Sequence, residues 1–226
     1  MDTFRGALAA IVTGIAAALV VVALSILPFL NPVWVGFEQG RAQAEAWTGF
    51  TPDQLRAVTG EVLADLVLGP PDFDVTLDGQ PVLKEREREH MRDVRSVFAS
   101  FYVVALVGFA VLVGAWVIAR GAEARGRFWR RLQKTGVAIA VVTVVGGLAG
   151  VLFFDAAFEL FHQAFFPAGT YLFDPATERL VQLFPFVFWE ETAMAVGALI
   201  IGLSLLTAWV AARRGTAAGR RGTAAG

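Results

Sequence analysis

The sequence predicts an all-α integral membrane protein with four transmembrane helices, both termini in the cytoplasm, and a small extracytoplasmic cap formed by two outer loops. Three observations lead to this fold class. The 226 residues are 56% hydrophobic and their mean hydropathy is +0.60, which is more apolar than an ordinary soluble domain of this size. Apolar stretches of membrane length occur four times, and lysine and arginine are concentrated in alternate connecting segments.

The four apolar stretches are each long enough to cross a bilayer, which takes about 20 helical residues. No charged residue interrupts any of them. They cover residues 6–30, 97–119, 136–154 and 192–212. The first is longer than the apolar part of a typical signal peptide and no small-residue cleavage site follows it, so we expect it to be a retained anchor.

The distribution of charge predicts the orientation of these spans. Segment 120–135 has six basic residues and one acid, and segment 213–226 has four arginines and no acid. By the positive-inside rule both are cytoplasmic. Segments 31–96 and 155–191 are rich in acids and are expected on the outer side. The last segment repeats RRGTAAG and is predicted to be a disordered basic tail.

The first outer loop, 31–96, is long enough for structure of its own. Thr51 as N-cap, Pro52 in the first turn and Gln54 three residues after Thr51 predict a helix over 52–68. Its apolar residues recur at helical spacing; they are Leu55, Val58, Val62 and Leu66. A small hairpin around Asp78-Gly79 is also possible, although Pro81 weakens it.

Composition and missing motifs exclude several kinds of function. The net charge of −1 gives no signal for nucleic-acid binding. With no cysteine, the chain cannot use a disulfide, a catalytic thiol or cysteine-ligated metal. Two histidines are too few for a histidine-rich metal centre. The sequence also lacks the Gly-x-Ser-x-Gly, His-Glu-x-x-His and phosphate-loop motifs.

One of the two histidines lies in EREREHMRDVR, residues 85–95, directly before the second span. Eight of these eleven residues are charged. On one continuous helix, Arg86, His90 and Asp93 share a face, so Asp93 can orient the imidazole as a general acid or base. The alternative interpretation is a solvated, salt-bridged start of a helix whose histidine has no function.

The other histidine, His162, lies in an aromatic stretch, FFDAAFELFHQAFFPAGTYLFDP. Asp155, Glu159 and His162 share one helical face there. The alternative interpretation is an interfacial histidine packed among aromatic rings. Taken together, His90 and His162 are expected on the outer side at one membrane depth, each beside a carboxylate. Ionisable groups at such a boundary are candidates for function.

These two stretches carry a resemblance to a known family. The first is similar to a motif Glu-Arg-Glu-x-x-His-Met-x-Asp-Val-Lys/Arg, with matches at Glu85, Arg86, Glu87, His90, Met91, Asp93, Val94 and Arg95. The second is similar to Phe-His-x-x-Phe-Phe followed by an aromatic residue and Phe-Asp-Pro, with matches at Phe161, His162, Phe165, Phe166, Phe173, Asp174 and Pro175. The chain thus resembles the lipoprotein intramolecular transacylase (Lit) family of four-span bacterial membrane proteins. Tyr171 stands where that family is expected to have tryptophan.

The resemblance implies a membrane acyltransferase. Its substrate would be a diacylated bacterial lipoprotein, and the sn-2 acyl chain of the diacylglyceryl group would move to the α-amino nitrogen of the same cysteine. The product would be a lyso-form lipoprotein. The protein would lie in the bacterial cytoplasmic membrane, in contact with membrane lipid, with its site at the outer leaflet. The reaction would need no cofactor and no metal.

The resemblance also implies roles for particular residues. His90 and His162 would carry out the proton transfers, with Asp93 orienting His90, and either histidine could be the base. Arg86 or Arg95 would stabilise negative charge. Tyr171 and Asp174 would complete the substrate-binding residues.

Three alternatives remain beside this hypothesis. A related acyl hydrolase or acyltransferase would use the same histidines with water or another amine as acceptor. A non-catalytic membrane protein would bind a partner through its outer loops. A transporter is disfavoured, because the spans contain no charged residue and no inverted repeat.

Overall fold

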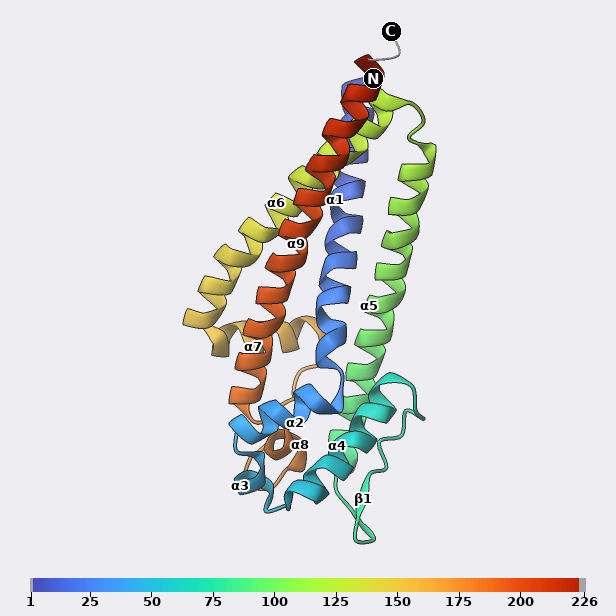
Figure 1. Cartoon of the computed structure of the whole chain (residues 1–226). Coiled ribbons are helices and arrows are strands. Elements are labelled where there is room, and N and C mark those ends of the chain that lie inside the picture. Colours follow the sequence, from blue (N-terminus) through green and yellow to red (C-terminus); the bar gives the residue numbers. More distant parts are fainter. Residues whose placement is uncertain (1, 224–226) are drawn as a thin grey trace. The chain divides into compact units, whose positions relative to one another are not determined.

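A computed structural model describes residues 2–223 of the chain. Four helices in this range are long and apolar enough to cross a membrane, which confirms the predicted number of spans (Figure 1). They are α1 (Asp2–Ile26), α5 (Glu85–Ile118), α6 (Ala122–Leu152) and α9 (Phe186–Thr223). Helix α5 starts in the charged segment and continues without a break through the apolar span, as the sequence predicts. The side of the membrane on which each end lies stays a prediction.

Shorter elements connect the long helices. Between α1 and α5 lie η1 (Leu27–Phe29), α2 (Pro32–Arg41), α3 (Ala44–Thr48), α4 (Pro52–Val67), β1 (Thr76–Leu77) and β2 (Gln80–Pro81). Between α6 and α9 lie α7 (Phe154–Phe165) and α8 (Arg179–Leu183). Helix α4 begins at the predicted capping box, in which the Thr51 and Gln54 side chains bond each other's backbone N–H groups. The hairpin turns at Asp78 and Gly79, both with positive φ, as a tight two-residue turn requires.

Two predicted segments differ from the structure. The basic segment 120–135, expected as a loop, is helical from Ala122 onward, with Gly121 at a φ of 82° in the short turn before it. The tail predicted to be disordered from 213 continues α9 as far as Thr223, and residues 224–226 lie outside the described range. Both segments are rich in arginine and contain no proline, so no residue in them forces an adjoining helix to stop.

The membrane-length helices contribute most of one compact unit, made of the described parts of 1–25, 101–148 and 196–226. Small residues allow close approach within it. A Cβ added to Gly108 of α5 would lie 3.1 Å from the Ala16 carbonyl oxygen of α1. A Cβ added to Gly136 of α6 would lie 2.6 Å from the Ser204 carbonyl oxygen of α9. Large apolar side chains such as Leu106 remain exposed, as expected of a surface that faces lipid.

The second compact unit, 26–100 and 149–195, contains the two segments predicted as outer loops. They fold together around one buried cluster formed by Val35, Ala42, Ala44, Leu55, Val58, Val62, Leu63, Phe73, Val75, Val82, Leu83, Met91, Leu180, Leu183, Phe184 and Phe188. A buried amide reinforces this packing: Gln39 of α2 donates to the Thr59 hydroxyl of α4 and to the Leu183 carbonyl of α8. The predicted helix face of α4 is confirmed, with Leu55, Val58 and Val62 buried.

A carboxyl pair joins α2 to the start of α9 in this second unit. Arg41 donates two hydrogen bonds to Glu191, which is also hydrogen-bonded to the buried Glu38. Burial first, and then the hydrogen bond and the negative charge of Glu191, raise the pKa of Glu38 from 4.5 to about 7. The nearby Arg41 opposes this rise. Glu38 therefore fits the folded protein best as a neutral acid that donates to Glu191.

Glu38 is expected to make stability depend on pH. Because its pKa is raised in the folded state, its contribution is complete below about pH 4.5 and is lost as the pH rises through about 7. Glu38→Gln keeps a donor and cannot ionise, so the variant should lose less stability between about pH 5 and pH 8, by on the order of 2 kcal/mol. Thermal unfolding in detergent at both pH values measures this, with the exposed Glu61→Gln as control. Equal pH dependence in wild type and Glu38→Gln would contradict the assignment.

The close contact at Gly136 gives a second prediction. Gly136→Ala should destabilise the protein by about 1–3 kcal/mol, because the new methyl group meets backbone atoms of α9. Gly146→Ala on the same helix is the matched control, since nothing lies within 4 Å of its added Cβ. That control should be neutral or stabilising by up to about 1 kcal/mol through helix propensity. Thermal unfolding of both variants in one detergent compares them, and a Gly136→Ala variant as stable as wild type would refute the close packing.

Candidate active site

His90 lies on α5 in a nearly closed aromatic surrounding. It is 6% exposed, and its ring centroid lies 4.8 Å from that of Phe166 and 5.3 Å from that of Phe173. Its Nδ1 atom is buried and has no hydrogen-bond partner among the described residues. A buried polar atom without a partner is costly, and such atoms persist mainly where they have a function. His90 therefore has an unused nitrogen available for a bound molecule.

His162 reaches the same place from α7. The two imidazole rings are nearly parallel, with 18° between their planes and 6.1 Å between their centroids. Nδ1 of His162 lies 2.8 Å from the carbonyl oxygen of Phe158 in the preceding turn. Because a carbonyl oxygen only accepts, Nδ1 must carry the hydrogen in this contact. In the neutral ring, Nε2 then keeps its lone pair and can accept a proton.

Aromatic rings hold His162 on several sides. The ring of Phe158 lies 4.2 Å from it and that of Tyr171 lies 5.1 Å from it, between centroids. The Tyr171 hydroxyl donates to Glu159 at 2.9 Å, and Gln163 donates to the same carboxylate at 2.9 Å. The hydrogen bonds from Gln163 and Tyr171 lower the pKa of Glu159, while burial and the bond to Glu159 raise the pKa of Tyr171. Tyr171 is thus a neutral phenol that donates to the ionised carboxylate of Glu159, and Glu159 lies one helical turn before His162.

Arg86 ties the segment 166–178 to α5. Its guanidinium donates to both oxygens of Glu178, at 2.8 and 3.0 Å, and to the Leu172 carbonyl at 2.8 Å. It also lies 4.9 Å from the centre of the Phe173 ring, which packs on His90. Arg86 stands one turn before His90, so it reaches the same face as the sequence predicts. Its cation is engaged by Glu178, and its structural effect is to position the segment that carries Phe173 and Tyr171.

Two buried carboxylates in this site were not predicted as site residues from the sequence. Glu87 is fully buried and accepts from the backbone N–H of Lys84 at 2.8 Å and of Leu180 at 2.6 Å. It therefore joins the first turn of α5 to the start of α8, where backbone N–H groups favour negative charge. Glu178 is 4% exposed and accepts from the Asp174 N–H at 2.6 Å as well as from Arg86. Glu87 is one of the residues that match the first motif. Glu178 belongs to neither motif, so no local sequence pattern marks it as a site residue.

Three residues predicted for the site lie elsewhere. Asp93 is exposed and makes no hydrogen bond or ion pair within residues 2–223, so it does not orient His90. The roughly 60° of helical rotation between positions 90 and 93 turns it to solvent. Arg95 donates to the carbonyls of Asp65 and Gly69 and so caps the end of α4. Asp174 is exposed, and its carboxylate accepts from the Ala176 N–H in its own turn.

In the part of the chain that the structure describes, no group of three or more His, Asp or Glu residues is arranged to hold a metal ion. What the site presents instead is a pair of imidazoles, one with a free buried nitrogen and one with a fixed tautomer. Four membrane-length helices with such a pair define an integral membrane protein whose site is suited to proton transfer.

The chain belongs to the family of the lipoprotein intramolecular transacylase Lit, whose family model matches residues 11–189. It is therefore a membrane acyltransferase that acts on lipoproteins. Comparison with curated proteins gives no match.

Three solved structures share the fold, all of Lit from Bacillus cereus. The first is 17% identical, with a TM-score of 0.73 over 97% of this chain and 99% of that one. Two others are variants in which one histidine is replaced. The arginine variant is 19% identical, with a TM-score of 0.73 over 98% and 96% of the two chains. The alanine variant is 19% identical, with a TM-score of 0.64 over 94% of each.

Replacing Glu178 tests the structural link to Arg86. Glu178→Gln removes the charge but keeps the shape, so the protein should fold with a stability loss of about 1–3 kcal/mol, since Arg86 is partly exposed to water. Backbone hydrogen exchange over residues 166–178 should become faster, because Arg86 then holds this segment only through the carbonyls of Gly169 and Leu172. Asp74→Asn, which breaks an exposed ion pair with Arg88, is the control. Unchanged exchange over 166–178 in Glu178→Gln would show that the ion pair does not position the segment.

Proposed function

We propose that this protein moves the sn-2 acyl chain of a diacylglyceryl-cysteine lipoprotein to the α-amino group of the same cysteine, by histidine acid–base catalysis. The product is a lyso-form lipoprotein with one remaining ester. The observation that carries the proposal is the pair of near-parallel imidazoles of His90 and His162, 6.1 Å apart. Membership of the Lit family supports the reaction type.

The chemistry requires three proton movements: the amine nitrogen loses one proton before attack and a second afterwards, and the leaving oxygen gains one. The α-amine of a peptide has a pKa of about 7.7–8.0, so much of it is protonated near neutral pH and must lose a proton before it attacks. The amine nitrogen then forms a bond to the ester carbonyl carbon, and the tetrahedral intermediate loses a second N–H proton as it collapses. The bond to the sn-2 oxygen breaks, and that alkoxide takes a proton. The amide and one free hydroxyl are the products.

The geometry supports a division of these roles between the histidines. His162 has Nδ1 committed to the Phe158 carbonyl, so its Nε2 lone pair is the base that takes the amine proton. The amine releases its first proton to water before it attacks, and His162 takes the N–H proton that the tetrahedral intermediate loses. His90, which is enclosed by rings, receives this proton from His162 and passes it to the departing sn-2 alkoxide. Both rings are therefore neutral before and after the reaction, and the one proton released overall is the first proton of the amine. No cofactor or metal takes part in this scheme.

Tethering lowers the remaining barrier. The amine and the ester belong to one molecule, so their encounter costs little translational entropy. The protein mainly has to fold the lipid head into a cyclic geometry. Helix α7 offers exposed apolar side chains for the acyl chains beside His162, namely Leu160, Phe161 and Phe165. Tyr171 contributes its ring to this surface while its hydroxyl is held by Glu159.

The distribution of charged residues along the chain supports a location of this reaction at the outer face of the membrane. Basic residues dominate the connection between the second and third spans, and the two histidines belong to the acid-rich segments. By the positive-inside rule the histidine site then faces the outer leaflet of the bacterial cytoplasmic membrane. A lipoprotein held in that leaflet by its acyl chains reaches the site from the lipid.

The test is mass spectrometry of the N-terminal peptide of a model diacylglyceryl lipoprotein, co-expressed with this protein in a host that lacks N-acylation. Wild type should yield an N-acyl, mono-O-acyl peptide. His90→Ala and His162→Ala should each reduce its formation by about 10²–10⁴-fold, the usual contribution of a general acid or base. Glu89→Gln, an exposed neighbour of His90 on α5, should retain activity.

Other outcomes separate the alternatives. A lyso-peptide with a free α-amine, together with free fatty acid, would identify a hydrolase. An unchanged diacyl peptide from folded, inserted wild type would reject the transacylase proposal for this substrate. Full activity in both alanine variants would reject the histidine mechanism and favour a role for the histidines in packing alone.

A further inference from the structure

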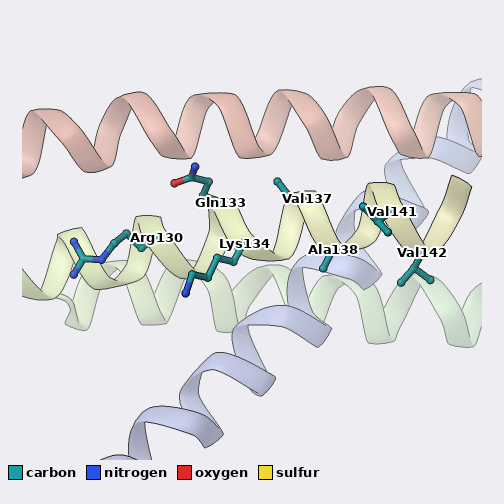
Figure 2. Close-up of a pocket in the computed structure, with 7 residues that line it drawn as sticks. All are labelled: Arg130, Gln133, Lys134, Val137, Ala138, Val141 and Val142. Carbon is teal, nitrogen blue, oxygen red and sulfur yellow. The ribbon is translucent and has the colours of Figure 1, made fainter. Parts of the chain in front are cut away.

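Helix α6 carries a cleft that the proposed reaction does not use. It has a volume of about 530 Å³ and is lined by Arg130, Gln133, Lys134, Val137, Ala138, Val141 and Val142. Figure 2 shows the polar side chains of this set along one part of α6 and the small apolar ones along the next turns. All lie in the compact unit formed by the membrane-length helices.

The lining residues form one helical stripe, because their spacing alternates between three residues and one residue. The packed face of α6 is a different one, where Gly136 and Ala140 are buried and Gly136 approaches α9. On the stripe, Val137, Val141 and Val142 are 46%, 56% and 70% exposed. The protein itself therefore leaves this apolar stripe uncovered.

Two cations stand at the polar end of the stripe without an acidic partner. Among the described residues, Arg130 and Lys134 make no ion pair and no hydrogen bond to a side chain. Their neighbours are engaged: Arg127 pairs with Glu123, and Arg131 donates to the Gly6 carbonyl. The cleft therefore presents free positive charge at one end only.

The dimensions suit one leaflet of a membrane. From Lys134 to Val142 the helix rises about 12 Å. Half of a hydrocarbon core is about 15 Å thick. A molecule with an anionic head at Arg130 and Lys134 and a hydrocarbon chain along the valines would match both the charge and the length of the stripe.

We propose that this cleft binds an anionic glycerophospholipid, with the phosphate between Arg130 and Lys134 and one acyl chain along Val137, Ala138, Val141 and Val142. The charges select an anionic head over a zwitterionic one, because a zwitterion gives no net attraction. Basic pockets beside membrane helices on the cytoplasmic side favour such lipids. This lipid is distinct from the lipoprotein substrate, and its binding does not depend on the transacylase reaction.

The experiment measures lipid binding by the purified protein in neutral detergent, with native mass spectrometry and thermal unfolding. Phosphatidylglycerol should bind and raise the unfolding temperature, whereas phosphatidylcholine should do so far less. Arg130→Gln combined with Lys134→Gln should weaken phosphatidylglycerol binding roughly tenfold or more, at about fivefold for each cation lost. Arg125→Gln combined with Arg127→Gln removes the same charge outside the cleft and should change binding by less than about twofold.

A second variant tests the apolar part separately. Ala138→Trp fills the cleft and leaves every charge in place, so it should also weaken phosphatidylglycerol binding. Equal losses in the two double variants would overturn the proposal in favour of general attraction to the basic end of α6. Unchanged binding in Ala138→Trp would overturn the acyl-chain position. Stabilisation by soluble glycerol phosphate as strong as that by the lipid would identify a site for free phosphate instead.

Discussion

The ion pair between Arg86 and Glu178 joins the start of α5 to the segment before α8 across 92 residues of sequence. Removing the Glu178 carboxylate from water is costly, and the cost is offset because it accepts from Arg86 and from the Asp174 backbone N–H. The same guanidinium holds the Leu172 carbonyl and lies over Phe173. Through these contacts the segment 166–178 is held against His90, and the aromatic enclosure of that histidine depends on them.

Glu87 supports this arrangement from the other side of the same turn. Its position between the Lys84 and Leu180 N–H groups fixes where α8 starts relative to α5. Helix α5 also continues unbroken into a membrane-length apolar segment. The charged motif and the apolar span are thus parts of one continuous helix, which is why a dense run of charge directly precedes a span. Many of these charges pair with one another or cap neighbouring backbone, whereas the buried Nδ1 of His90 has no hydrogen-bond partner among the described residues.

The distribution of polar partners separates side chains that are bonded to other segments from side chains that keep a ring nitrogen unbonded. The side chains of Arg86, Glu87, Glu178 and Arg95 each make hydrogen bonds to protein atoms in other segments. His90 does not, and His162 uses only Nδ1. The fold is shared with Lit structures at 17–19% identity. In this chain the positioning contacts join elements that are far apart in sequence.

The sequence by itself determined the four spans, the capped helix α4, the continuous helix α5 and the two histidines as candidates, because these follow from local composition, periodicity and residue chemistry. Helical spacing also placed Arg86 on the face of His90. The same spacing did not predict the exposure of Asp93. A residue about 60° round the helix from His90 can point inward or to solvent, and only packing decides which. The tertiary structure alone decided that His90 and His162 stack, that Glu178 binds Arg86, and that Arg95 caps α4. Those contacts join residues 26 to 92 positions apart, and no local pattern in the chain records such long-range partners.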